Sequence, residues 1–288
     1  MRVILIGKNG QLGRSFQNIV DKRKYNNNFT FVGRDELDLT NDKNIDKYFD
    51  DNHFDLIINC AAYTNVDRAE EETALAEQIN HLAVLKLSKV ANKKKAKLIH
   101  ISTDYVFDGK NVKPYLEIDK TSPINTYGRT KLSGEEALLK VMPTNAMVIR
   151  TSWIFSKHGN NFVNTMLKLG REKNEINVVT DQIGSPTYAD DIANDILKII
   201  DNKKFINKTM PSEIYHYSNL GEVSWYDFAK EIFKIAKLDC KVVPIKTSSY
   251  PTLAKRPLNT ILNKDKIVQE FEINLSFWRD SLIKNLTN

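Results

Sequence analysis

Short runs of aliphatic and β-branched residues alternate with longer amphipathic stretches over the first half of the chain. The short runs lie at 3–6, 29–33, 55–60, 98–102 and 146–151, and the amphipathic stretches lie at 11–22, 42–52, 69–93 and 127–140. Strands separated by helices of this length need crossover connections, which produce a parallel sheet with helices on both faces. The pattern therefore predicts an α/β fold with a doubly wound parallel sheet.

The alternation becomes less regular after residue 152. We expect helices at 161–171, 190–200, 225–237 and about 275–286, with a strand at 176–179. No low-complexity linker separates the two halves, so we expect the second to pack on the first. We predict a dinucleotide-binding domain at 1–152, rejoined by about 176–200, and a smaller C-terminal substrate domain that occupies most of 153–288.

The composition is that of a globular protein with dispersed charges. Of the 288 residues 41% are hydrophobic, and the net charge of +6 arises from 42 basic and 36 acidic residues. The densest basic run, at 93–95, closes a predicted helix, where cations suit the negative end of the helix dipole. We therefore expect no nucleic-acid partner, and the mild positive bias suits a small anionic ligand such as a nucleotide diphosphate.

Cysteine and histidine spacing indicates neither a disulfide framework nor a metal site. The two cysteines are Cys60 and Cys240, and none of the five histidines lies four residues from another or beside a cysteine. The apolar run at 3–6 is too short for a signal peptide, and no window approaches a membrane span. We expect a cytoplasmic protein with no metal and no membrane partner.

Three glycines follow the first predicted strand at a spacing that suits phosphate binding. Gly7, Gly10 and Gly13, with Gln11 and Leu12 before the last, stand where that strand gives way to a helix. Glycine permits a sharp turn and a close approach of backbone to pyrophosphate, and a helix N-terminus supplies unpaired N–H groups. The pattern predicts a dinucleotide site in a Rossmann-like sheet; the alternative is a helix cap with incidental glycines.

The end of the second predicted strand bears on which dinucleotide binds. Arg34 and Asp35 follow this strand, about twenty residues past Gly13, where NAD sites place an acidic residue on the ribose. The Arg34 guanidinium suits a 2′-phosphate, and a solvated loop charge is the equal alternative. The sequence therefore predicts NADPH or NADH without choosing between them.

Tyr127 and Lys131 are candidates for proton transfer. They lie four residues apart, so a helix places them on one face within reach of each other. A close cation favours the phenolate and lowers the pKa of a tyrosine, which makes a usable proton donor or acceptor near neutral pH. The same spacing recurs at Tyr226 and Lys230 within an apolar helix face, where we interpret it as packing. Tyr127 instead follows the strand that ends at Thr103, at the edge where open parallel sheets bind ligands.

The chain resembles the extended short-chain dehydrogenase/reductases in eight ordered blocks. These blocks are G-K-N-G-Q-L-G at 7, A-A-Y-T-N-V-D at 61, S-T-D-Y-V-F at 102, S-P-I-N-T-Y-G-R-T-K at 122, R-T-S-W-I-F at 150, G-N-N-F at 159, D-Q-I-G-S-P-T at 181 and Y-P-T-L-A-K-R-P at 250. They are most similar to the members that reduce nucleotide-linked 4-keto sugars. The resemblance implies hydride transfer from NADPH or NADH to the C4 ketone of dTDP-4-dehydro-L-rhamnose, giving dTDP-L-rhamnose.

The resemblance also implies roles for individual residues. Tyr127 is expected to protonate the forming oxyanion, Thr103 to hydrogen-bond it, and Lys131 to bind the nicotinamide ribose and lower the Tyr127 pKa. The other residues expected to contact the cofactor are Gly7, Gly10, Gln11, Leu12, Gly13, Arg34, Asp38, Leu39, Ala61, Ala62 and Tyr63. The residues expected to contact the nucleotide sugar are Thr64, Val66, Thr103, Asp104, Tyr105, Trp153 and Arg256. Packing at a domain junction is the alternative for Tyr105 and Trp153, and a surface ion pair is the alternative for Arg256.

Related activities stay open at this point. A 4,6-dehydratase is disfavoured, because Tyr105 stands where that enzyme needs an acidic residue. A nucleotide-sugar epimerase uses the same three catalytic residues, and a non-catalytic nucleotide-binding regulatory subunit shares the fold. Some members hold Mg²⁺ at a dimer interface through an acidic residue in the first helix. Here Arg14 and Ser15 occupy that place, which argues against metal-bridged dimerisation and leaves a monomer or a homodimer as the expected state.

Overall fold

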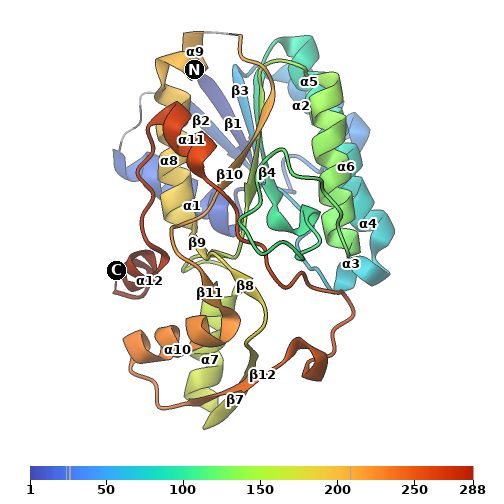
Figure 1. Ribbon diagram of the computed structural model, residues 1–288. Helices are drawn as coiled ribbons and strands as arrows, with labels where there is room; N and C mark the ends of the chain where they lie inside the picture. The colour runs from blue at the N-terminus through green and yellow to red at the C-terminus, as the bar shows by residue number, and fades with distance from the viewer. Residues whose placement is uncertain (24, 26, 208, 288) are drawn as a thin grey trace.

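The central element of the fold is a six-stranded parallel sheet. The computed structural model describes residues 1–23, 25, 27–207 and 209–287. The chain moves outward from β1 to β2 and then returns to β3 on the other side of β1, so the switch point of the sheet lies between β1 and β3 (Figure 1). The order is β10-β5-β4-β3-β1-β2, with β1 (Arg2–Ile6), β2 (Asn28–Val32), β3 (Leu56–Asn59), β4 (Lys97–Thr103), β5 (Ala146–Thr151) and β10 (Glu213–Tyr217).

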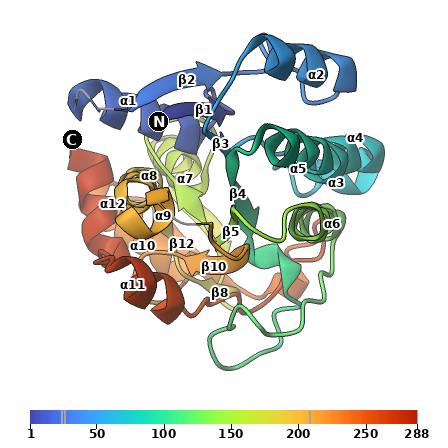
Figure 2. The ribbon, with the colours of Figure 1, turned by 90° about the horizontal axis from the view of Figure 1, so that it is seen from above.

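Helices cover both faces of the sheet, as Figure 2 shows from above. On one face α1 (Gln11–Arg23) packs beside α8 (Ala189–Asp201), and on the other lie α2 (Asp42–Asp51), α5 (Ala83–Lys94) and α6 (Thr126–Val141). Alternate residues of β1 enter the two apolar cores, because successive side chains of a strand point to opposite faces. The predicted doubly wound α/β fold is confirmed.

A smaller lobe follows β5 and lies at the bottom of Figure 1. Its two-stranded parallel sheet pairs β7 with β12, and its apolar core is rich in aromatic residues such as Phe155 and Phe228. Shorter strands pair as β6 with β9 and β8 with β11. The elements after β5, apart from α8 and β10, are β6 (Ile154–Phe155), α7 (Phe162–Glu172), β7 (Glu175–Val179), β8 (Ile183–Gly184), β9 (Thr187–Tyr188), α9 (Lys203–Asn207), β11 (Val223–Ser224), α10 (Trp225–Ala236), β12 (Lys241–Ile245), η3 (Thr247–Ser249), α11 (Asp265–Phe271) and α12 (Trp278–Thr287). Two of these helices lie with the large sheet and not in the smaller lobe, since α9 packs on α8 and α11 packs on β10.

The chain path differs from the expected one in two places. The stretch expected as one helix at 69–93 is α3 (Arg68–Glu71), α4 (Thr73–Glu77), a π-helical turn η1 (Gln78–Leu82) and then α5. The late strand of the large sheet is β10, which pairs with β5, whereas β7 pairs with β12. In the 176–200 segment α8 packs on the first half, against α1. The division into a dinucleotide-binding and a substrate domain stays a prediction.

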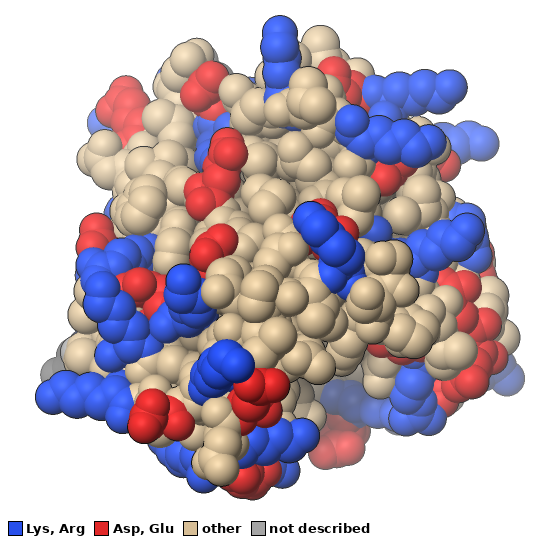
Figure 3. All heavy atoms as spheres, turned by 60° about the horizontal axis from the view of Figure 1, so that its bottom comes forward, with Lys and Arg blue, Asp and Glu red and all other residues tan. Residues whose placement is uncertain are grey.

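The surface mixes charges of both signs. On the face that Figure 3 shows, basic and acidic side chains are interspersed around areas of other residues. Among the described residues, no helix combines the length and the apolar character needed to cross a membrane. Within the same part of the chain, no group of three His, Cys, Asp or Glu side chains is arranged to hold a metal ion.

A buried ion pair holds α6 against the sheet. Glu135 of α6 accepts hydrogen bonds from Arg150 of β5, at 2.7 Å from Nη2 to Oε2 and 3.1 Å from Nε to each carboxylate oxygen. Ser102 of β4 also donates its hydroxyl to Glu135. The Arg150 and Glu135 side chains are 3% and 1% exposed. Two buried charges of this kind are tolerated only because each neutralises the other.

Removal of one partner should therefore cost far more than removal of both. We expect Glu135→Leu to lower the free energy of unfolding by about 3–5 kcal/mol, because Arg150 then remains buried and uncompensated. The double variant Glu135→Leu/Arg150→Met removes both charges and keeps apolar volume, so it should regain most of that loss. Urea denaturation followed by circular dichroism measures both values. A double variant no more stable than the single one would contradict this account.

Candidate active site

A large cleft opens where β1, β3, β4 and β5 reach their carboxyl ends. Its volume is about 730 Å³, a size that accommodates a cofactor or substrate. The position agrees with the rule that ligands bind at the switch point of open parallel sheets. The predicted residues that line it are Gly7, Gly10, Gln11, Leu12, Arg34, Asp38, Leu39, Ala61, Ala62, Thr64, Val66, Thr103, Asp104, Tyr105, Tyr127, Lys131 and Trp153.

The glycines build the floor of this cleft by bringing backbones together. Gly7 has φ +97°, and a Cβ there would stand 2.8 Å from the backbone nitrogen of Ala61, which follows β3. A Cβ on Gly13 would stand 2.2 Å from the Gly7 carbonyl oxygen, so only glycine allows α1 to pack this closely on the turn. Gly13 itself does not line the cleft. Gly10 meets only an ordinary contact at 3.4 Å. The backbone-lined cradle at the start of α1 fits the pyrophosphate of a dinucleotide.

The loop after β2 offers one loosely held cation to the cleft. The Arg34 side chain is 76% exposed, and its Nε lies 3.9 Å from Asp38 Oδ1. Asp38 Oδ1 is itself bonded by the Thr40 backbone N–H at 2.9 Å and hydroxyl at 2.8 Å, and these bonds lower the pKa of Asp38. Glu36, in contrast, is taken up by the Gly33 N–H and by an ion pair with Lys8. Arg34 is thus the cation in this loop that can turn toward a ligand.

The structure brings Thr103, Tyr127 and Lys131 together in one wall of the cleft. Thr103 ends β4, where its hydroxyl donates to Asp104 Oδ1 at 3.0 Å and accepts from the Tyr105 N–H at 3.2 Å. The Tyr105 and Tyr127 rings meet edge to face, with centroids 5.8 Å apart. Asp104 is 2% exposed, and burial raises its pKa to about 6. The wall is therefore partly buried and carries several hydroxyl groups.

The expected electrostatic effect of Lys131 on Tyr127 is not found. Burial raises the pKa of Tyr127 to about 12, although a hydrogen bond with Thr103 opposes the shift. Burial also lowers the pKa of Lys131 to about 8. The Lys131 Nζ donates to the Ile101 carbonyl at 2.7 Å and lies 3.3 Å from His100 Nε2, so its polar neighbours are on β4 and not on Tyr127. The spacing correctly predicted that Tyr127 and Lys131 lie on one helix. It carries no information on how much water each side chain loses, and this loss determines both pKa values.

The start of α6 is fixed from several directions, and this places Tyr127. Asn125 Oδ1 caps the helix by accepting from the Gly128 N–H at 2.7 Å. The carboxylate of Glu70 accepts from the Thr126 backbone N–H at 2.7 Å and from its hydroxyl at 2.8 Å. A Cβ on Gly128 would stand 2.2 Å from the Tyr105 carbonyl, so the helix packs directly on η2 (Asp104–Val106).

Trp153 lies in the cleft wall but offers one face rather than two. Its ring stacks on Trp225 with centroids 3.4 Å apart and an interplanar angle of 7°. A Cβ on Gly184 would stand 2.6 Å from the Trp153 ring, so the ring also packs closely against the Gly184 backbone. Trp153 has φ +46°, an uncommon conformation for a bulky residue that the surrounding packing maintains. The tryptophan pair forms a preformed aromatic wall of the cleft.

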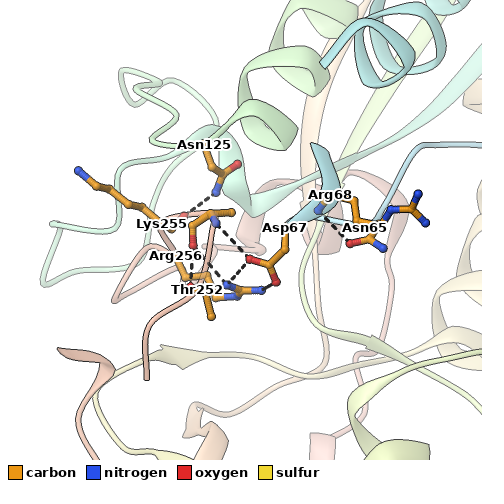
Figure 4. A network of polar contacts seen from close by, with 8 residues as sticks. Asn65, Asp67, Arg68, Asn125, Thr252, Lys255 and Arg256 are labelled. Carbon is orange, nitrogen blue, oxygen red and sulfur yellow. Dashed lines mark hydrogen bonds and ion pairs between the residues drawn. The ribbon is translucent and has the colours of Figure 1, made fainter. Parts of the chain in front are cut away.

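Two further predicted residues lie outside the cleft lining. Arg256 was expected to reach the diphosphate; instead its guanidinium pairs with Asp67, at 2.6 Å from Nη2 to Oδ2 and 3.1 Å from Nη1 to Oδ1 (Figure 4). The ion-pair alternative describes what the structure holds. The Tyr63 hydroxyl donates to Glu72 at 2.5 Å, and the Tyr63 N–H donates to Asn80. Other side chains occupy both groups in this structure, and their expected ligand contacts stay predictions.

Sequence reasoning missed parts of the cleft that the smaller lobe supplies. Trp225 was expected only as apolar packing in a helix, and 159–161 were noted as a block without a role, yet all of them line the cleft. Asn161 donates to Gln11 Oε1 at 2.9 Å and so joins this segment to the start of α1. The second tyrosine–lysine pair behaves as interpreted: Lys230 Nζ lies 5.1 Å from the Tyr226 ring centre, outside the cleft lining.

Fold and cleft together place the chain among the Rossmann-like short-chain dehydrogenase/reductases. The family model described as the RmlD substrate binding domain matches residues 1–288. The chain belongs to this family. It is 41% identical to a dTDP-4-dehydrorhamnose reductase of Aggregatibacter actinomycetemcomitans, over 99% of this chain and 98% of that protein. A Streptomyces niveus relative, named dTDP-4-keto-6-deoxy-D-glucose reductase, is 34% identical over 92% of this chain and 89% of its own length.

Solved structures agree with this assignment. A dTDP-4-dehydrorhamnose reductase from Clostridium acetobutylicum matches with a TM-score of 0.92 and 37% identity, covering 99% of this chain and 98% of that one. The enzyme of the same name from Bacillus anthracis, solved in complex with NADP, matches with a TM-score of 0.91 and 37% identity, with the same coverage of both chains. The family resemblance drawn from the eight sequence blocks is confirmed.

Proposed function

We propose that this chain reduces the C4 ketone of dTDP-4-dehydro-L-rhamnose to give dTDP-L-rhamnose, with NADPH or NADH as reductant. The observation that carries the proposal is the meeting of Thr103 and Tyr127 in the wall of a cleft whose floor is a glycine cradle. Relatives and solved structures that cover nearly the whole chain bear the name of this activity, which supports the choice of substrate.

The cofactor would lie along the carboxyl edge of the sheet. The cradle at Gly7 and Gly10 would hold the pyrophosphate, Arg34 and Asp38 would face the adenosine ribose, and Lys131 the nicotinamide ribose. When bound, the reduced nicotinamide supplies the hydride. Arg34 favours a 2′-phosphate at this position, because a guanidinium and a phosphate form charge-assisted hydrogen bonds.

Tyr127 acts as the general acid in this mechanism. Its pKa of about 12 keeps the phenol protonated at neutral pH, so a proton is available when negative charge develops on the sugar oxygen. Thr103 donates a hydrogen bond to the same oxygen once its hydroxyl turns from Asp104. The charged form of Lys131, one helical turn from Tyr127, stabilises the phenolate that remains.

The sugar would lie between the two lobes. The large domain contributes Thr64, Val66 and Tyr105, and the smaller lobe contributes the paired rings of Trp153 and Trp225. We propose that the smaller lobe is the substrate domain on this ground, since aromatic faces suit a sugar or base. A nucleotide-sugar substrate also accords with a cytoplasmic location and with either a monomer or a homodimer.

Consumption of the reduced cofactor tests the proposal directly. The purified protein is mixed with NADPH or NADH and enzymatically prepared dTDP-4-dehydro-L-rhamnose, and absorbance at the nicotinamide band is followed. We expect stoichiometric oxidation and formation of dTDP-L-rhamnose. The comparison substrate is dTDP-4-keto-6-deoxy-D-glucose, which carries the same nucleotide on a different keto sugar. Isomerisation of the sugar without net oxidation would support the epimerase instead, and no reaction with either cofactor would refute the reductase.

Substitution of Tyr127 should separate the two tyrosine–lysine pairs. Tyr127→Phe removes the proton donor and keeps the ring, so we expect kcat to fall by about 10²–10⁴-fold. Tyr226→Phe is the matched control in α10 and should retain kcat near the wild-type value. Steady-state kinetics with saturating cofactor and sugar measure both variants. Equal losses in the two would show that the choice between the pairs is wrong.

Substitution of Arg34 should reveal the cofactor preference of the loop after β2. Arg34→Ala removes the cation that suits a 2′-phosphate, so we expect the KM for NADPH to rise by about 10–100-fold while the KM for NADH changes little. The control is Arg23→Ala, which removes an exposed arginine from the last turn of α1, the end of the helix away from the glycine cradle. An equal rise with both cofactors would exclude a contact specific to the phosphate.

A further inference from the structure

A buried line of polar groups connects the cleft floor with Lys131. The Ala61 N–H donates to Asn59 Oδ1 at 3.1 Å, and Asn59 Nδ2 lies 3.1 Å from His100 Nδ1. The other ring nitrogen of His100, Nε2, lies 3.3 Å from Lys131 Nζ. Asn59, His100 and Lys131 are 1%, 0% and 1% exposed, so the three side chains have almost no contact with solvent.

The positions of the protons on this line follow from its first bond. Because Asn59 Oδ1 accepts from Ala61, the Asn59 amide nitrogen faces His100, and an amide nitrogen can only donate. The His100 Nδ1 must therefore accept, and a neutral imidazole then carries its single proton on Nε2. Burial, and secondarily Lys131, hold the pKa of His100 well below its usual value, so the ring is neutral.

This tautomer presents an N–H donor to the amine of Lys131. An ammonium has only donors, so it cannot accept from the His100 Nε2–H, whereas a neutral amine can. The second bond of Lys131, its donation to the Ile101 carbonyl at 2.7 Å, is available to either form. The contact with His100 therefore favours the neutral lysine and opposes the charged one.

The other titratable groups around Lys131 act differently. Burial is the largest influence and lowers the pKa of Lys131, whereas Glu135 on α6 and Cys60 after β3 raise it. Glu135 is bonded to Arg150, which reduces its pull on the lysine. Tyr127, one turn earlier on α6, is protonated at neutral pH and brings no charge. His100 is thus the neighbour whose bonding depends most directly on the lysine proton.

We propose that His100 is a positioning residue that holds Lys131 at the cleft wall and disfavours its protonated form. The consequence for turnover rests on the proposed function, in which charged Lys131 stabilises the phenolate of Tyr127. Activity then falls as pH rises through the pKa of Lys131. By lowering this pKa, His100 sets the alkaline limit of the enzyme.

The first test requires no activity. Nitrogen-15 NMR of the wild-type protein labelled at histidine reports which ring nitrogen carries the proton. Its five histidines give separable signals, and His100 is assigned by loss of its signal in His100→Gln. If that variant does not fold, substitution of the other four assigns it by elimination. We expect a proton on Nε2 and a bare Nδ1 between pH 6 and 8. A proton on Nδ1 would overturn the proposal.

The second test is the pH dependence of kcat. The glutamine in His100→Gln offers a carbonyl that can accept from an ammonium, so the alkaline limb should move up by about one pH unit. His216→Gln is the control: His216 is 0% exposed and lies on β10, outside the cleft lining. Its limb should not move. An unmoved or lowered limb in His100→Gln contradicts the proposal. If the wild type never oxidises NADPH or NADH with the sugar, the proposed function fails, while the NMR result still decides the state of His100.

Discussion

The geometry of the cleft depends on one carboxylate, that of Glu135. It lies one turn beyond Lys131 on α6 and is bonded to Arg150 of β5 and Ser102 of β4, the residue before Thr103. One buried group therefore connects the helix that carries the candidate acid with both strands beneath it. Because each charge is stranded if its partner moves away, α6 cannot shift along the sheet without a large energetic cost.

The other end of α6 is held by hydrogen bonds to loops. Glu70, from the segment after β3, binds Thr126, and the side-chain nitrogen of Asn125 donates to the Lys255 carbonyl, a contact visible in Figure 4. The Arg256 ion pair with Asp67 ties the same C-terminal loop to the segment after β3. Tyr127 thus lies between a buried ion pair and a network of loop contacts. Such bracing orients a proton donor before any ligand arrives, which is how preorganised sites lower the barrier to reaction.

The predictability of each feature followed from whether its cause was local. The alternation of apolar runs sufficed for the parallel sheet, and the glycine spacing located the cradle, because both patterns depend on neighbouring residues. β10 escaped prediction because its sequence E-I-Y-H-Y contains no aliphatic run, and its burial comes from pairing with β5, about 65 residues earlier in sequence. Trp225 was assigned to packing alone, since only the fold brings it against Trp153. The Tyr127 pKa was misjudged for the same reason: spacing in a helix says which groups are neighbours but not how much water they lose.

Loss of water explains why the acid and the lysine divide their tasks as they do. Burial disfavours charge on both groups, so it raises the pKa of Tyr127 to about 12 and lowers that of Lys131 to about 8. A phenol in this state keeps its proton across the neutral range and releases it only to a group that develops negative charge. The lysine is the partner whose charge can change within that range. Its state therefore depends in part on the N–H donor of His100, which faces it from β4, and this makes the position of the His100 proton a determinant of the chemistry at Tyr127.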